Sequence, residues 1–126
     1  MPYYTALVSL LTVMFLFFLA TRVAAARKKF NVRPPSTTGN VDFERVFRVH
    51  MNTLEWVPIF LVSLWLCAIH LSDVAAAALG IVWIGGRMLY LIGYSEAVEQ
   101  RRNGFLIQSI ACASLFVGAL AGILTR

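Results

Sequence analysis

Three polar residues interrupt an otherwise apolar stretch of this sequence at helical spacing. Arg48, Asn52 and Glu55 stand at offsets of 0, 4 and 7 within "FERVFRVHMNTLEWVPIF". Because an α-helix turns once in about 3.6 residues, these offsets put the three side chains on one face. An arginine and an amide can bind a carboxylate, and a glutamate can bind an ammonium group, so this face suits a small zwitterion.

A second polar strip lies further along the chain. Arg87, Tyr90, Tyr94 and Arg101 stand at offsets of 0, 3, 7 and 14 within "GRMLYLIGYSEAVEQRRNGF". Ionisable groups in apolar helices are costly unless they face a protein interior or a wet cavity, so two such strips predict a binding site. Two arginines and two tyrosines add forked donors and hydroxyls on flat apolar rings, which favours a carboxylate-rich ligand.

The elements that carry these strips are predicted to be transmembrane helices. The chain has 126 residues, of which 60% are hydrophobic and 13% charged, and its mean hydropathy is +0.76. This composition indicates an all-α membrane protein, because about 20 apolar residues span a bilayer as a helix. We predict a single domain over 1–126, a four-transmembrane-helix bundle with spans at about 3–26, 44–71, 74–95 and 104–125. The first is predicted to be a retained span rather than a secretory signal, because the basic cluster follows its apolar run instead of preceding it.

The basic residues predict how the bundle is oriented. Ten of the eleven Lys and Arg residues lie at or near the first and third connections. The positive-inside rule then predicts that both connections are cytoplasmic, in an endoplasmic reticulum membrane if the protein is eukaryotic or an inner membrane if it is bacterial. Nucleic acid is not an expected partner, because the basic residues flank lipid spans and form no separate module.

Other chemistry finds little support in the sequence. Cys67 and Cys112 lie within apolar spans, which predicts buried, unreactive thiols. His50 and His70 lack the paired spacing of a metal site, so no metal is expected. Phosphate-loop, dinucleotide and serine-nucleophile motifs are also absent from the sequence.

Two longer segments resemble a known membrane family. "FERVFRVHMNTLEWVPIFLVSLW" and "GRMLYLIGYSEAVEQR" are similar to the two signature regions of the MAPEG proteins, the membrane-associated proteins of eicosanoid and glutathione metabolism. The resemblance runs from about 26 to 104 and includes the loop "RPPSTTG". Within the family the chain is most similar to type 2 microsomal glutathione transferases and leukotriene C synthases.

The resemblance implies a homotrimer that binds glutathione as co-substrate at each subunit boundary, without a metal. The catalytic residue would be Arg101, which would stabilise the glutathione thiolate. A lipophilic electrophile or a lipid hydroperoxide would arrive through the membrane, for conjugation or for reduction. The residues implied to bind glutathione are Arg27, Arg48, His50, Asn52, Glu55, Trp56, Arg87, Tyr90 and Tyr94. His50 and Trp56 depart from the family pattern, in which glutamine and tyrosine or phenylalanine are common.

Alternative interpretations remain for most of these residues. Interhelical ion pairs would also explain Arg45, Arg48 and Glu55. An interfacial aromatic belt would explain Tyr90 and Tyr94, and a membrane anchor would explain Arg101. The same fold includes the five-lipoxygenase-activating protein, which presents a lipid without catalysis. The alternatives to a transferase are therefore a non-catalytic lipid-presenting protein and a purely structural trimer.

Overall fold

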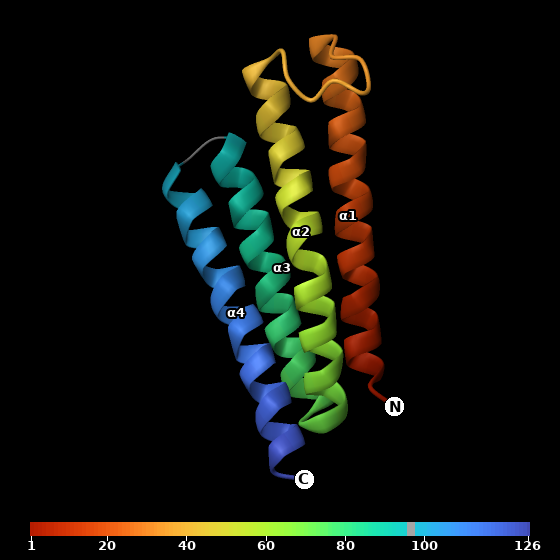
Figure 1. The fold of residues 1–126 in the computed structure, drawn as a ribbon, viewed down its shortest axis with the longest axis vertical. Coiled ribbons are helices and arrows are strands. Elements are labelled where there is room, and N and C mark those ends of the chain that lie inside the picture. The colour runs from red at the N-terminus through yellow and green to blue at the C-terminus, as the bar shows by residue number, and fades with distance from the viewer. Residues whose placement is uncertain (96–97) are drawn as a thin grey trace.

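The computed structural model describes residues 1–95 and 98–126, and it folds as four long antiparallel helices (Figure 1). The four helices are α1 (Tyr3–Phe30), α2 (Val41–His70), α3 (Asp73–Ser95) and α4 (Val98–Leu124). All four are long and apolar enough to cross a membrane, which confirms the prediction of an all-α protein with four candidate spans. Residues 96 and 97 of the second signature segment lie outside the described part.

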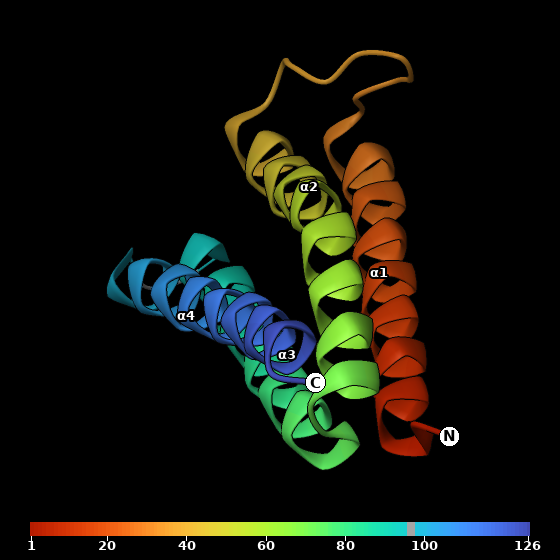
Figure 2. The ribbon, with the colours of Figure 1, turned by 60° about the horizontal axis from the view of Figure 1, so that its bottom comes forward.

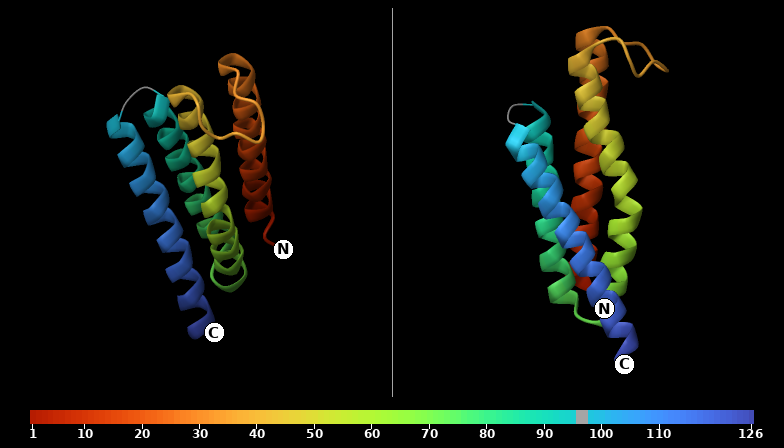
Figure 3. Two further views of the ribbon diagram at one scale, coloured as in Figure 1. Left: turned by 45° about the horizontal axis from the view of Figure 1, so that its top comes forward. Right: turned by 60° about the vertical axis from the view of Figure 1, so that its left-hand side comes forward.

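The bundle places the two termini at one end and the long first loop at the other. Figure 1 shows the N-terminus, the C-terminus and the turn between α2 and α3 at the same end. Figures 2 and 3 show α1 beside α2 and α3 beside α4. Helix α3 packs most extensively against α4 and also contacts α1 and α2, whereas α1 and α4 do not touch within the described residues. Helix α2 likewise contacts α1, α3 and α4, so α2 and α3 together connect the two helix pairs.

Helix α1 is longer than the sequence predicted. It continues through the basic turn to Phe30 instead of ending at 26, and Asn31 closes it in a left-handed conformation with φ 55°. Arg27, Lys28 and Lys29 occupy the last turn, where positive charge is favoured by the helix dipole. The prediction was wrong here because it ended the helix where hydrophobicity ended.

The starts of α2 and α4 also differ from prediction. Helix α2 begins at Val41 rather than 44, because the Asn40 side chain caps it by accepting the backbone N–H of Phe43 at 3.0 Å. Helix α4 begins at Val98 rather than 104, so Arg101 stands on a helix and not in a connection. Polar residues do not by themselves end a helix. They mark where the helix leaves the hydrocarbon of the bilayer.

The core gathers where α2, α3 and α4 meet. Phe60 and Trp83 stack with ring centroids 3.9 Å apart, and both side chains are fully buried. Cys67 and Cys112 are free and buried in the same cluster, as predicted from their apolar surroundings. Much of the outer surface is apolar instead of polar, including Met14 and Phe17 on α1. Such a surface is suited to lipid rather than water.

Candidate functional site

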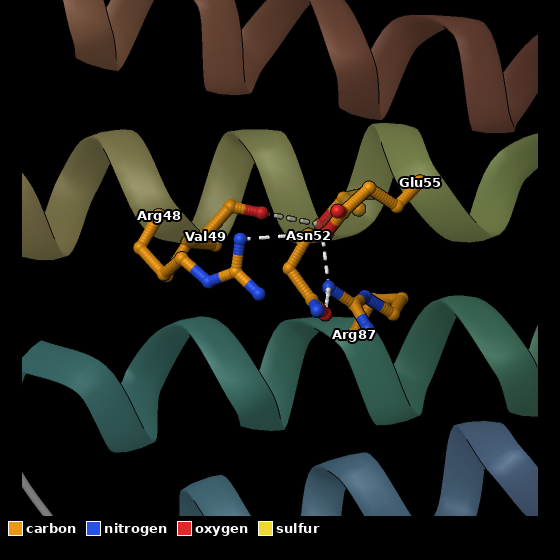
Figure 4. Close-up of polar contacts among 6 residues, drawn as sticks. Arg48, Val49, Asn52, Glu55 and Arg87 are labelled. Atoms are coloured by element: carbon orange, nitrogen blue, oxygen red, sulfur yellow. Dashed lines mark hydrogen bonds and ion pairs between the residues drawn. The ribbon is translucent and has the colours of Figure 1, made fainter. Parts of the chain in front are cut away.

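A buried arginine joins the two predicted polar strips. Arg87 of α3 is 0% exposed, and its Nη2 donates to Asn52 Oδ1 at 2.9 Å and to Thr53 Oγ1 at 2.7 Å (Figure 4). The Thr53 hydroxyl in turn donates to the carbonyl oxygen of Val49 at 2.8 Å. These bonds fix the Asn52 amide with its oxygen occupied. Its amino group is therefore the donor that remains for a ligand.

An exposed ion pair lies beside this buried network. Arg48 Nη1 and Glu55 Oε1 on α2 are 3.4 Å apart, and their side chains are 52% and 61% exposed. A pair this exposed stabilises a fold by only about 0–1 kcal/mol, because water screens both charges. A zwitterionic ligand can therefore replace each partner at little cost. Figure 4 shows Arg48 and Asn52 on the side of α2 that faces α3.

The tyrosines extend the network to α4. The Tyr90 and Tyr94 rings meet edge to face with centroids 5.0 Å apart, and Arg87 Cζ lies 4.4 Å from the Tyr90 ring centre. Arg101 of α4 places its Cζ 4.9 Å from the ring centre of Tyr94, which is a cation–π contact. The structure thus brings Arg101 to the loop end of the same strip, but from α4 and not from the helix of Arg87 as the spacing predicted, because the chain reverses between α3 and α4.

Glycines bring α4 this close to α3. A Cβ added at Gly93 would collide with the backbone of Arg101, and one added at Gly104 would collide with the backbone nitrogen of Tyr90. Gly85, by contrast, faces open space within the described chain. Gly93 and Gly104 were not predicted from the sequence, although their positions near the second strip and the general use of small residues at helix contacts could have pointed to them.

Two further residues were missed by sequence reasoning. Phe105 bridges Trp56 and Tyr90, with ring centroid distances of 5.8 Å and 5.9 Å, and so brings Trp56 to the site. Thr53 of α2 accepts a hydrogen bond from Arg87 Nη2 through its side-chain oxygen. A hydroxyl next to Asn52 in an apolar span was the only signal for Thr53, and Phe105 carried none, since phenylalanine is common throughout the chain.

Arg27 and His50 are not brought to this face within one chain. Arg27 Nη1 donates to the carbonyl oxygens of Val32 at 3.3 Å and Ser36 at 2.8 Å, and its Cζ lies 5.0 Å from the Phe43 ring centre. His50 follows Arg48 by two positions, a rotation of about 200° around the helix. Both residues therefore belong to a different surface from Asn52.

A cleft of about 410 Å³ lies at the loop end of the strips. Arg48 and Tyr94 are among its lining residues, together with Thr37 of the loop and Phe47 of α2. The volume is within the range of small-molecule sites, about 300–1,000 Å³. Among the residues that the structure describes, no group of three His, Cys, Asp or Glu side chains is arranged as a metal site would require.

The fold and this site define the class of the protein. It is a multi-pass membrane protein of four helices, with a polar site built between α2, α3 and the start of α4. A sequence profile of the MAPEG family matches residues 5–121, so the chain belongs to the MAPEG family.

The relatives of this chain come from bacteria and mammals. It is 42% identical to microsomal glutathione S-transferase 2 of Homo sapiens over 116 residues, which cover 91% of this chain and 79% of the human protein. It is 36% identical to leukotriene C4 synthase of Bos taurus over 121 residues, 96% of this chain and 81% of the synthase. An uncharacterised protein of Synechocystis sp. is 50% identical over 119 residues, 94% of this chain and 87% of that protein.

Proposed function

We propose that this protein is a membrane-bound glutathione transferase, which activates glutathione as the thiolate and conjugates it to a lipophilic electrophile. The name of the human relative, microsomal glutathione S-transferase 2, supports glutathione chemistry for this chain. The observation that carries the proposal is the contiguous set of Arg48, Asn52 and Glu55 with the buried Arg87 beneath them. This set presents donors for carboxylates and an acceptor for an ammonium group, which are the charged groups of glutathione.

In the proposed mechanism Arg101 stabilises the sulfur anion. A free thiol has a pKa of about 8.5, so only a few per cent is nucleophilic at neutral pH. A cation about 4 Å from the sulfur favours the thiolate by about 1 kcal/mol in water and about 4 kcal/mol at an effective dielectric of about 20. Arginine keeps its proton at any ordinary pH, so its role is electrostatic and not that of a base. Water or bulk solvent takes the thiol proton.

The second substrate is proposed to enter from the lipid. Phe105 and Trp56 stand between the polar strip and the apolar outer surface, so an electrophile dissolved in the membrane needs no aqueous route. We propose peroxide reduction as a second reaction, in which the thiolate attacks the outer oxygen of a lipid hydroperoxide, the O–O bond breaks to release the lipid alcohol, and a second glutathione converts the resulting sulfenic acid to glutathione disulfide and water. The membrane is proposed to be the endoplasmic reticulum or a bacterial inner membrane, with the loop end in the cytoplasm.

The proposed assembly is a homotrimer in which each site lies between two copies. Arg48 and Glu55 of the strip on α2 are half-exposed, whereas the Arg27 side chain donates to the loop carbonyl of Ser36 and His50 lies about 200° around α2 from Arg48. A neighbouring copy that presents its Arg27 and His50 to this strip would complete the predicted glutathione-binding set. That arrangement would also exclude water from Arg101, which is exposed in the single chain.

The experiment that tests the function is an ultraviolet titration of the detergent-purified protein with glutathione at neutral pH, which detects the thiolate. We expect a saturable signal that Arg101→Ala abolishes while glutathione still binds. Arg102→Ala is the matched control, because Arg102 is exposed on the next position of the same helix and should leave the signal unchanged. Conjugation of model electrophiles and reduction of an organic hydroperoxide would then be measured with the same variants.

The alternative function is a non-catalytic lipid-presenting protein like the five-lipoxygenase-activating protein. Bound glutathione without a thiolate signal would favour this alternative. An equal signal from Arg101→Ala would remove Arg101 from its proposed role, and absence of glutathione binding to the folded protein would refute the transferase.

A further inference from the structure

A second cleft, separate from the one that contains Arg48, lies between α1, α2 and α3 near the loop end of the bundle. Its volume is about 360 Å³, and its charged lining consists of Arg22 and Lys29 from α1 with Asp42 and Arg45 from α2. Tyr94 separates it from the cleft described above, since it lines both. The two clefts are therefore neighbours with different charged residues, apart from Arg45 at their shared edge.

The second cleft contains more hydrogen-bond donors than acceptors. Three cations face one carboxylate, and that carboxylate is already in an ion pair, with Asp42 Oδ1 3.7 Å from Arg45 Nη1. The Nε of Arg22 is buried and has no hydrogen-bond partner among the described residues. A buried donor without an acceptor costs about 1–3 kcal/mol. An anion in the cleft would balance the excess positive charge of these side chains.

The remaining walls of the cleft are apolar. Ala25 and Ala26 of α1 line one side, and Val46, Val49 and Leu91 line the others. The cleft lies where the helices leave their most apolar stretches and carry the basic residues, as headgroup-facing ends of spans do. A ligand with an anionic group and an apolar continuation would match both parts of this surface.

We propose that this cleft binds the phosphate group of an anionic phospholipid from the leaflet next to the loop. Arginine provides forked donors that fit phosphate oxygens, and Lys29 adds a point charge. Basic pockets between transmembrane helices are suited to anionic headgroups for this reason. A zwitterionic headgroup would bring its own cation towards Arg22 and Lys29 and would bind less well. A soluble phosphate ester shares the recognised group and is the other source of it. This site goes beyond the proposed glutathione chemistry and does not depend on it.

The first test uses the unmodified protein in a non-ionic detergent. Native mass spectrometry with equal amounts of phosphatidylglycerol and phosphatidylcholine should show one phosphatidylglycerol per chain retained at least about fivefold over phosphatidylcholine, the effect of about one surface charge. Glycerol 3-phosphate and inorganic phosphate form the second arm, read by thermal stabilisation. Equal retention of the two lipids, with no stabilisation by either phosphate, would overturn the proposal. Tight binding of soluble phosphate with no lipid preference would keep the phosphate site and overturn its assignment to lipid.

A pair of double variants separates a built site from general surface charge. Arg22→Gln with Lys29→Gln removes two cations that line the cleft, and Lys28→Gln with Arg33→Gln removes two exposed cations nearby that do not line it. We expect the first pair to weaken phosphatidylglycerol binding about 30-fold, at roughly fivefold per charge, and the second pair to weaken it less than about fivefold. An equal loss in both pairs would overturn the proposal. If the first pair does not fold, the lipid competition on the unmodified protein still decides it.

Discussion

Replacement of Arg87 by methionine should separate ligand binding from fold stability. Methionine keeps an unbranched apolar chain in the helix but removes the guanidinium that holds Asn52 and Thr53. Interhelical hydrogen bonds in membrane proteins contribute about 0.6–1.7 kcal/mol each, so the two lost bonds amount to about 1–3 kcal/mol. Asn52 would then lose the contact that orients its amide.

The opposing contribution comes from the donors that Arg87 leaves unsatisfied. Its Nε and Nη1 are buried and have no hydrogen-bond partner within the described chain. Each unmatched donor costs about 1–3 kcal/mol, and a buried charge replaced by a packed apolar group is often neutral in stability. The two unmatched donors cost about 2–6 kcal/mol together, and the two lost bonds, the lost cation–π contact with Tyr90 and the newly unpaired Asn52 oxygen come to a similar sum, so the two contributions nearly cancel. We therefore expect the melting temperature of Arg87→Met to lie within about 5 °C of the native value.

The Arg87→Met variant should bind glutathione more weakly although its stability hardly changes. A disordered Asn52 loses about one ligand hydrogen bond, roughly 1.4 kcal/mol, which is a tenfold higher dissociation constant. Calorimetric titration of glutathione into Arg87→Met measures it, and Arg102→Met is the control, since it removes an exposed arginine elsewhere. A loss of more than about 10 °C in melting temperature, with native affinity in the folded fraction, would refute the reasoning and make Arg87 a residue of the fold alone.

Three further changes test the packing and the charges around the site. Gly93→Ala should force α3 and α4 apart at Arg101 and lower both the melting temperature and the thiolate signal, whereas Gly85→Ala, which meets open space, should alter neither. Asp73→Asn weakens the cap on the backbone N–H of Thr5, at 2.9 Å from the carboxylate, and should lower the melting temperature slightly without changing glutathione affinity, because Asp73 begins α3 next to the α2–α3 turn, at the end opposite to the site. Glu55→Gln should weaken binding of glutathione more than that of an analogue without its amino group, as paired titrations would show.

Helical periodicity predicted the residues that the structure gathers. One helix face carries Arg48, Asn52 and Glu55, because offsets of 4 and 7 are close to one and two full turns of a continuous helix. Periodicity did not place Arg101, which reaches Tyr94 from a second helix because α4 begins early and packs closely on α3. The number of spans followed from hydropathy, since each helix must cover the hydrocarbon of the bilayer.

Three features of the structure could not be predicted from the sequence, each for a physical reason. Hydropathy reports where a helix leaves the hydrocarbon and not where it ends, so the ends of α1, α2 and α4 were misplaced by several residues. Close helix contact depends on which glycine faces which backbone, and this distinguishes Gly93 from Gly85. Nearness in sequence does not mean a shared surface, which is why His50 stands between Arg48 and Asn52 yet projects away from both.

Arg27 and His50 lie away from the strip that contains Arg48. Mixed oligomers can therefore test whether the proposed glutathione site forms within one chain or between two. Arg27→Ala and Arg101→Ala would each reduce turnover strongly when present in every copy. In mixed oligomers from equal co-expression, each site between two copies takes its Arg101 from one chain and its Arg27 from the next. About one site in four then receives both native residues, and activity returns to about a quarter of native. Arg48→Ala mixed with Arg101→Ala is the control, because both lesions lie in the same half and no intact site can form. If the Arg27→Ala and Arg101→Ala mixture stays inactive while its chains co-purify, the site would have to be completed within one chain.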